Sequence, residues 1–586
     1  MLHYEKDSQF TPVLKSSIHS DTFFNSLDGA TNPRAELMAT LEAFTRAAGD
    51  NSNTHAQCKF RGRYIWLREQ LKFSTTTLPE VTCPEYDLWS LNGSTESISI
   101  IFATGYLGNP ASYYGHTLLK MNSHKKNRST KLEDVTVNYG AIVPPGEGPI
   151  PYILKGLFGG YDAGFSHIQY YFHDHNYGEN ELRDLWEYEI NLTPAELGLV
   201  LGHAWEVLGQ KYTYYFAKRN CAYRLAELLE VVEGIDIIPD NPLWIVPQGL
   251  VQKVARARHG SKPLVKNVIY HPSRQSRLYK KFASLNADQK KVIEQTVNNI
   301  EVLESDTFSA LEVTDKQSIL DTLLDYYQYI RNADLLKKDV NNTYYRQVLA
   351  KRYQIPAGEL SIANTPENSP HKGRKPSLVN LGAVHNNKFG SGTSFLFRPA
   401  YYDALDADFG HIKNASLSML EARLVMFDGD IKLRSLDIVN IESINNAVTG
   451  LPGDTGQAWK LRFGFQQQSL ACESCLVASL QGDIGHTFSI KNNMVVGGYL
   501  GGSLQQDKNE LGALYTRASI FANAELNSDL RVRFTSEYRE YLDSIQSGDF
   551  INAVYVRYRL ARNVDIRLSY EKNRTEEVGA SLSLYW

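Results

Sequence analysis

The sequence predicts an α+β protein that ends in an antiparallel β-barrel of about 12 strands. From residue 377 onward, apolar and polar side chains alternate in segments of roughly ten to fifteen residues, as in strands with one apolar face. Between residues 85 and 250, strand-like runs occur among amphipathic helical runs, which predicts a sheet packed against helices. A chain of 586 residues is too long for one ordinary core. We expect parts at 1–84, 85–250, 251–376 and 377–586.

Composition excludes some classes of function. A net charge of -4 and a pI near 6.5 argue against a generic nucleic-acid-binding protein. The chain has no apolar run long enough for a transmembrane helix. Residues Met1 to Glu5 lack the charged head and apolar stretch of a signal peptide. Either the protein is cytosolic or the numbering begins after a cleaved signal.

The first part, residues 1–84, is predicted to be a small helical segment. Asn32 and Pro33 are suited to the cap and first turn of a helix that buries Leu37, Leu41 and Phe44.

The second part begins with the strand 97–102 and a second strand near His116, and Thr193 to Glu196 form a capping box for a later helix. Glycines and prolines crowd residues 140–165, which predicts a long loop without regular secondary structure. Such a loop could be a lid or a gate for an acyl chain, or simply a connection.

One cysteine stands where a helix should begin. Asn220 is a natural N-cap, and Cys221 follows it directly. The N–H groups and dipole of a helix N-terminus favour thiolate over thiol, which prepares a nucleophile. His116, at the head of an apolar run, could accept the thiol proton, and Asn138 could hold the imidazole in the useful tautomer. The alternative is that Cys221 is a small buried hydrophobic residue.

The order His, Asn, Cys resembles that of the permuted papain-like proteins, which include permuted NlpC-type enzymes. Residues 109–117, 137–140 and 216–229 together resemble the Lnb family of bacterial lipoprotein N-acyltransferases over roughly residues 85 to 235. The resemblance implies a permuted papain-like thiol domain with Cys221, His116 and Asn138 as catalytic residues. Other residues of these runs are then expected to orient the site or contact substrate: Ser112, Tyr114, Tyr139 and Asn220.

The third part, residues 251–376, is predicted to be basic and helical. No acidic residue occurs from Val251 to Phe282, whereas lysine and arginine recur. Such a segment could face anionic lipid headgroups, or it could be a solvated linker. The polar stretch 364–377 indicates a domain boundary.

The fourth part resembles a bacterial outer-membrane barrel, with its arginines facing the lumen and Trp586 in an interfacial girdle. A soluble β-sandwich would show similar alternation. If Cys58 pairs with Cys83 and Cys472 with Cys475, Cys221 alone remains a thiol, which suits an enzyme in the oxidising periplasm. Five reduced thiols in the cytosol is the alternative.

Three functions follow as expectations. In the first, Cys221 takes an acyl chain from a phospholipid and passes it to an amine, which the resemblance identifies as a lipoprotein N-terminus. The second is a peptidoglycan amidase or peptidase with the same triad. The third is a non-catalytic outer-membrane assembly or transport protein. We expect phospholipid, lipoprotein and the outer membrane as partners, and no nucleic acid, cofactor or metal. His173, Asp174 and His175 lack a third partner at metal-binding spacing.

Overall fold

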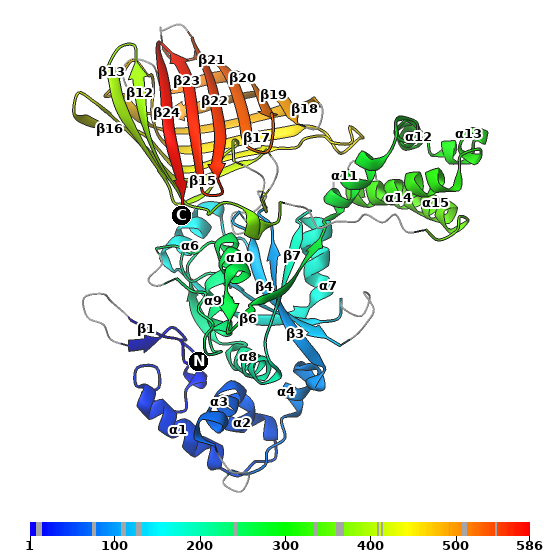
Figure 1. Ribbon diagram of the computed structural model, residues 1–586, viewed down its shortest axis with the longest axis vertical. Helices are drawn as coiled ribbons and strands as arrows, with labels where there is room; N and C mark the ends of the chain where they lie inside the picture. The colour runs from blue at the N-terminus through cyan, green and yellow to red at the C-terminus, as the bar shows by residue number, and fades with distance from the viewer. Residues whose placement is uncertain are drawn as a thin grey trace. The chain divides into compact units, whose positions relative to one another are not determined.

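The chain folds into two compact units, Met1–His271 and Pro272–Trp586 (Figure 1). The computed structural model describes residues 1–6, 14–72, 78–106, 113–124, 132–239, 243–331, 338–358, 368–406, 409–411, 414–490, 493–506, 512–544 and 548–586. Among these residues, no helix is both long and apolar enough to cross a membrane. The four-part division remains a prediction.

The first unit begins with a small group of helices, as predicted. Its elements are β1 (Tyr4–Lys6), β2 (Leu14–Ser16), α1 (Pro33–Thr45), α2 (Ala56–Lys59), α3 (Arg61–Leu71) and α4 (Pro84–Trp89). Asn32 caps α1 by accepting a hydrogen bond from the backbone N–H of Ala35. The predicted burial of Leu37 is wrong, because α1 instead turns Glu36 inward, where its carboxylate accepts a hydrogen bond from buried Arg63 at 2.7 Å.

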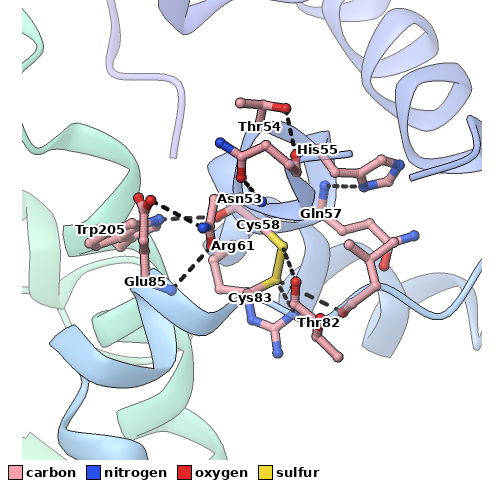
Figure 2. Close-up of a disulfide and its surroundings, with 12 residues drawn as sticks. Asn53, Thr54, His55, Gln57, Cys58, Arg61, Thr82, Cys83, Glu85 and Trp205 are labelled. Carbon is pink, nitrogen blue, oxygen red and sulfur yellow. Dashed lines mark hydrogen bonds between the residues drawn. A yellow bond between two sulfur atoms is a disulfide. The ribbon is translucent and has the colours of Figure 1, made fainter. Parts of the chain in front are cut away.

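A disulfide joins Cys58 of α2 to Cys83, which precedes α4 (Figure 2). The indole N–H of Trp205, on helix α8 (Pro194–Val207) of the same unit, donates to the backbone carbonyl of Cys58 at 3.0 Å. The predicted pairing of these two cysteines is therefore confirmed, and the hydrogen bond from Trp205 fastens the helical segment to the following domain.

A seven-stranded sheet forms the centre of the first unit. Its strands are β3 (Thr95–Ala103), β4 (His116–Ser123), β5 (Val135–Ala141), β6 (Tyr161–Gln169), β7 (Leu185–Ile190), β8 (Lys211–Tyr214) and β11 (Val265–His271). Their order is β11-β7-β3-β4-β5-β6-β8, with every neighbouring pair antiparallel.

Helices cover one face of this sheet and form the main core. They are α8 (Pro194–Val207), α9 (Cys221–Leu229) and α10 (Pro247–Arg256). On the other face, Leu118 and Leu185 pack with Tyr170, which opens α7 (Tyr170–His173). A π-helix (Asp174–Asn180) continues from α7.

The stretch rich in glycine and proline contains a helix, α6 (Pro149–Phe158). The prediction that residues 140–165 lack regular structure is therefore wrong. Pro149 occupies the first turn, where its missing N–H costs nothing, and Gly159 ends the helix with a φ of +82°. These residues mark the ends of a helix.

The basic stretch 251–282 is built into both units. It contributes part of α10, β9 (Arg258–His259), β10 (Lys262–Pro263), edge strand β11 and most of α11 (Arg274–Ser284). Several of its cations face carboxylates: Lys266 lies 3.2 Å from Glu189, and Arg274 and Lys281 both contact Asp325.

In the second unit, helices precede the barrel. They are α11, α12 (Ala287–Asn298), α13 (Asp306–Ser309), α14 (Val313–Ile330) and α15 (Lys338–Tyr353). The hydroxyl of Tyr326 on α14 donates to the backbone carbonyl of Pro452 at 2.9 Å, which attaches this helix to a barrel turn.

The barrel consists of long antiparallel strands: β12 (Leu378–Asn386), β13 (Gly390–Arg398), β15 (Ser416–Phe427), β16 (Asp430–Ile444), β17 (Gln457–Gln467), β18 (Leu476–Ile490), β19 (Met494–Gln505), β20 (Leu514–Glu525), β21 (Leu530–Tyr541), β22 (Asp549–Ala561), β23 (Val564–Asn573) and β24 (Thr575–Tyr585). The first of them, β12, pairs with the last, β24, while β13 pairs with both β12 and β15. Without the short β14 (Ala400–Tyr402), these strands close into a ring of 12, as predicted.

Side chains alternate across the barrel wall. Outward-facing Ile484, Leu500 and Ile520 are exposed. Inside the barrel, Arg557 and Arg567 form ion pairs with Asp565. These two arginines therefore face the lumen, as predicted.

The second predicted disulfide is absent, because Cys472 and Cys475 are free thiols in the turn between β17 and β18. The Cys475 thiol instead donates to the backbone carbonyls of Cys472 and Ser469, at 3.5 and 3.9 Å. The inference that Cys221 is the only thiol is therefore wrong.

Candidate active site

Cys221 is the first residue of α9, and Asn220 is its N-cap as predicted. The side-chain carbonyl of Asn220 accepts from the N–H groups of Ala222 and Tyr223, at 3.1 and 3.3 Å. Its amide N–H₂ donates to the carbonyls of Phe216 and Ile245, at 2.9 and 2.7 Å. One buried side chain therefore both starts the helix and ties together the two segments around it.

His116 is the first residue of β4, and the turn before it requires glycine. Gly115 has a φ of +83°, and a Cβ there would lie 2.7 Å from the carbonyl oxygen of Ala103. In the register of β4 and β5, Leu118 pairs with Asn138, so His116 and Asn138 are diagonal neighbours on one sheet face. The imidazole Nε2 lies 2.6 Å from the side-chain Oδ1 of Asn138. When Nε2–H donates in this bond, Nδ1 is left for the thiol.

The thiol and the imidazole shift each other's pKa. Burial raises the pKa of Cys221, but the charge of His116 and hydrogen bonds from His116 and Thr117 outweigh burial and lower it to about 7. Burial lowers the pKa of His116, but the Cys221 thiolate and the hydrogen bond with Asn138 raise it above its usual value. This mutual stabilisation favours a thiolate beside an imidazolium.

The other predicted site residues lie at different depths. Tyr114 is half-buried just before Gly115, and burial raises its pKa. Tyr139 is fully buried and packs among Phe165, Tyr212 and Tyr214. It therefore contributes to the core behind the site. Ser112 lies outside the described residues.

Three residues near the site were not singled out from the sequence as site residues. The backbone N–H of Thr117 donates a hydrogen bond to the sulfur of Cys221, and the ring of Tyr177 lies 6.1 Å from that of His116. His173 stacks on Tyr177 at 5.5 Å, and burial together with the charge of His116 lowers its pKa to about 4. Because of this lowered pKa, His173 is a neutral imidazole near pH 7. Thr117 could have been suspected from the sequence as the neighbour of His116, but no local signal places the π-helix beside His116.

No group of three or more metal-ligating side chains lies together in the part of the chain that the structure describes. The arrangement of a buried thiolate, an imidazole and an orienting amide is suited to attack on an acyl carbonyl. The nucleophile Cys221, the proton acceptor His116 and Asn138, which fixes the tautomer of His116, lie close together.

Known protein families match three parts of the chain. Residues 85–254 match the model described as the Lnb N-terminal periplasmic domain, which contains His116, Asn138 and Cys221. Residues 1–70 and 367–586 match two domains of unknown function, DUF7843 and DUF7840. No curated protein sequence matches the chain. The resemblance to the Lnb family, predicted over roughly residues 85 to 235, is confirmed.

Some solved structures are similar to the barrel region. The NanC porin is 8% identical, with a TM-score of 0.25, and the match covers 36% of this chain and 100% of that one. The KdgM porin is 8% identical, with a TM-score of 0.24 and coverage of 36% and 99%. Omp33 of Acinetobacter baumannii is 9% identical, with a TM-score of 0.21 and coverage of 36% and 99%. The periplasmic domain and the closed, outwardly apolar barrel make this chain an outer-membrane protein with a periplasmic domain.

Proposed function

We propose that the periplasmic domain is a cysteine-dependent acyltransferase that moves an acyl chain from a phospholipid to an amine, such as the N-terminus of a lipoprotein. The observation that carries this proposal is the contact of Cys221 with His116 at the start of α9, with the thiol pKa lowered to about 7. The match to the Lnb N-terminal periplasmic domain supports the lipoprotein as acceptor. The permuted papain-like relationship is part of the same proposal.

In the first half-reaction, the Cys221 thiolate attacks the ester carbonyl of the phospholipid. A carbon–sulfur bond forms, the ester carbon–oxygen bond breaks, and His116 gives its proton to the departing lysophospholipid oxygen. The product is a thioester on Cys221. The backbone N–H of Cys221, at the N-terminus of α9, is suited to the oxyanion of the tetrahedral intermediate.

In the second half-reaction, a neutral amine attacks the thioester carbon. The carbon–nitrogen bond forms, the carbon–sulfur bond breaks, and His116 takes the proton from nitrogen. The thiolate is regenerated, so no cofactor is consumed. Asn138 keeps Nε2 of His116 protonated throughout, which leaves Nδ1 to exchange the proton.

The test is the intact mass of the full-length protein after incubation with phospholipid in detergent. We expect one added acyl group that neutral hydroxylamine removes, and no such group on the Cys221→Ser variant. Absence of the adduct, together with cleavage of peptidoglycan peptides by the wild type, would identify the alternative amidase.

A further inference from the structure

The connection between β5 and β6 leaves large apolar side chains uncovered. Leu154 and Phe158 lie four residues apart on α6, hence on one side of it, and are 51% and 79% exposed. Ile142 and Val143, which follow β5 directly, are 60% and 37% exposed. Single exposed apolar residues are common on protein surfaces, whereas this connection exposes four large ones. We call these four side chains the α6 apolar surface.

This surface belongs to a helix that is attached to the segment before the nucleophile. The N–H of Phe216 donates to the carbonyl of Gly156 on α6 at 2.8 Å, and the ring of Tyr152 packs on that of Phe216 at 5.1 Å. Gly156 and Gly159 leave no room for a side chain, since a Cβ at Gly159 would lie 2.6 Å from the ring of Tyr215. The helix backbone therefore rests directly on residues 215 and 216.

The same segment continues to the catalytic cysteine. The carbonyl of Phe216 accepts from the side chain of Asn220, which caps α9 and precedes Cys221. A ligand bound to α6 is therefore connected to the start of α9 through two hydrogen bonds, one between Gly156 and Phe216 and one between Phe216 and Asn220.

The occupant follows from where the domain works. The periplasmic domain is joined in one chain to an outer-membrane barrel, so it is tethered to a bilayer. Short helices with one apolar side lie in the headgroup region of bilayers, and large apolar side chains supply the binding energy. Lys155, the charged residue of α6, is neutralised by Glu147, which precedes the helix and lies 2.8 Å away. The α6 apolar surface is therefore bordered by an ion pair rather than by an unpaired charge of α6.

We propose that the α6 apolar surface inserts into the phospholipid leaflet facing the periplasm and delivers lipid acyl esters to Cys221. This proposal rests on the proposed function, because it names how the donor reaches the site. It makes α6 a lipid-binding element, whereas the proton transfers remain those of Cys221 and His116.

The first experiment measures contact with lipid and needs no catalysis. In the full chain, Phe158 is replaced by photoreactive p-benzoylphenylalanine, and the protein is reconstituted in vesicles of phosphatidylethanolamine and phosphatidylglycerol. The matched control carries the same group at Leu88 of α4, which is 70% exposed. We expect illumination to add the mass of a phospholipid at position 158 about tenfold more often than at position 88. Equal labelling at the two positions would overturn the proposal.

The second experiment separates delivery of lipid from chemistry. Leu154→Glu and Phe158→Glu are compared with Leu88→Glu on two donors, phospholipid vesicles and a water-soluble short-chain ester. We expect the first two variants to acylate Cys221 about tenfold more slowly from vesicles and at the wild-type rate from the soluble ester, since a carboxylate resists insertion among lipids. Unchanged rates from vesicles, or equal losses on both donors, would contradict the proposal. If the wild type forms no adduct with either donor, the proposed function fails, while cross-linking at position 158 still decides the lipid contact.

Discussion

The active site and the barrel lumen both bury charged groups, but they satisfy them very differently. In the lumen, the carboxylate of Asp406 accepts from Arg398 at 2.9 Å, Arg567 at 3.0 Å and the hydroxyl of Tyr585 at 2.7 Å. At the active site, the imidazole of His116 has hydrogen bonds with Asn138 and with the thiol of Cys221. A buried charge with several fixed partners is held in one state, whereas a buried group whose partner also titrates can still exchange a proton.

The largest expected effect follows from removing the nucleophile. Cys221→Ser should lower formation of the acyl adduct by about a thousandfold or more, because a serine hydroxyl beside this imidazole is a far weaker nucleophile than a thiolate. Thermal unfolding should stay near that of the wild type, since the two side chains have similar shapes. The matched control is Cys475→Ser, which changes another buried thiol and should keep full activity. Comparable loss in both variants would mean that the defect is one of folding.

Removal of the imidazole should come next. His116→Ala should reduce turnover by roughly 10²- to 10⁴-fold, since it removes the group that moves protons in both half-reactions. The variant should also raise the pKa of Cys221, because burial then acts without an opposing cation.

Alkylation by iodoacetamide across pH reports this pKa directly. In the wild type the rate should rise through a midpoint near pH 7, as the thiol loses its proton. In His116→Ala the midpoint should move above the usual value of a free thiol. An unchanged midpoint would show that His116 does not stabilise the thiolate.

A change in the lumen should have the opposite profile, with loss of stability and no loss of chemistry. Asp406→Ala leaves Arg398 and Arg567 with Asp403 as their one shared carboxylate among the described residues. Removal of one acid from this buried cluster should cost about 3 to 5 kcal/mol of barrel stability. The temperature at which the barrel changes its mobility on a gel measures this effect. Acylation of Cys221 from a soluble ester should be unchanged below that temperature. Equal damage to acylation would erase the distinction between the two regions.

The smallest effect is expected from the orienting amide. Asn138→Ala should slow acylation by roughly 10- to 100-fold, since it removes the contact that fixes the imidazole tautomer and leaves the thiolate partner in place. Asn138→Asp tests the same point, because an added carboxylate oxygen can still accept from Nε2 and should restore most of the rate. A loss as large as that of His116→Ala would assign Asn138 more than an orienting role.

Features that depend on neighbours in the sequence could be predicted. Asn220 before an apolar helical stripe identified the start of α9, and strict alternation identified a barrel of about 12 strands. The Cys58–Cys83 pair also followed from its placement around a helix.

Features that depend on distant contacts could not be predicted. Leu37 is exposed because a salt bridge between Glu36 and Arg63 turns α1 the other way. His173 and Tyr177 reach His116 only because α7 and the π-helix lie over that face of the sheet. No periodicity in the chain encodes that approach.

Acyl transfer from Cys221 to an amine can be followed in a single-turnover chase of the acylated protein. Full-length protein acylated on Cys221 is freed of lipid and mixed with a peptide whose N-terminal cysteine carries a diacylglyceryl group. If Cys221 carries the acyl group to the amine, the acyl mass leaves the protein at the rate at which N-acylated peptide forms, in equal amounts. Decay of the adduct to free fatty acid, at a rate independent of the peptide, would contradict this transfer.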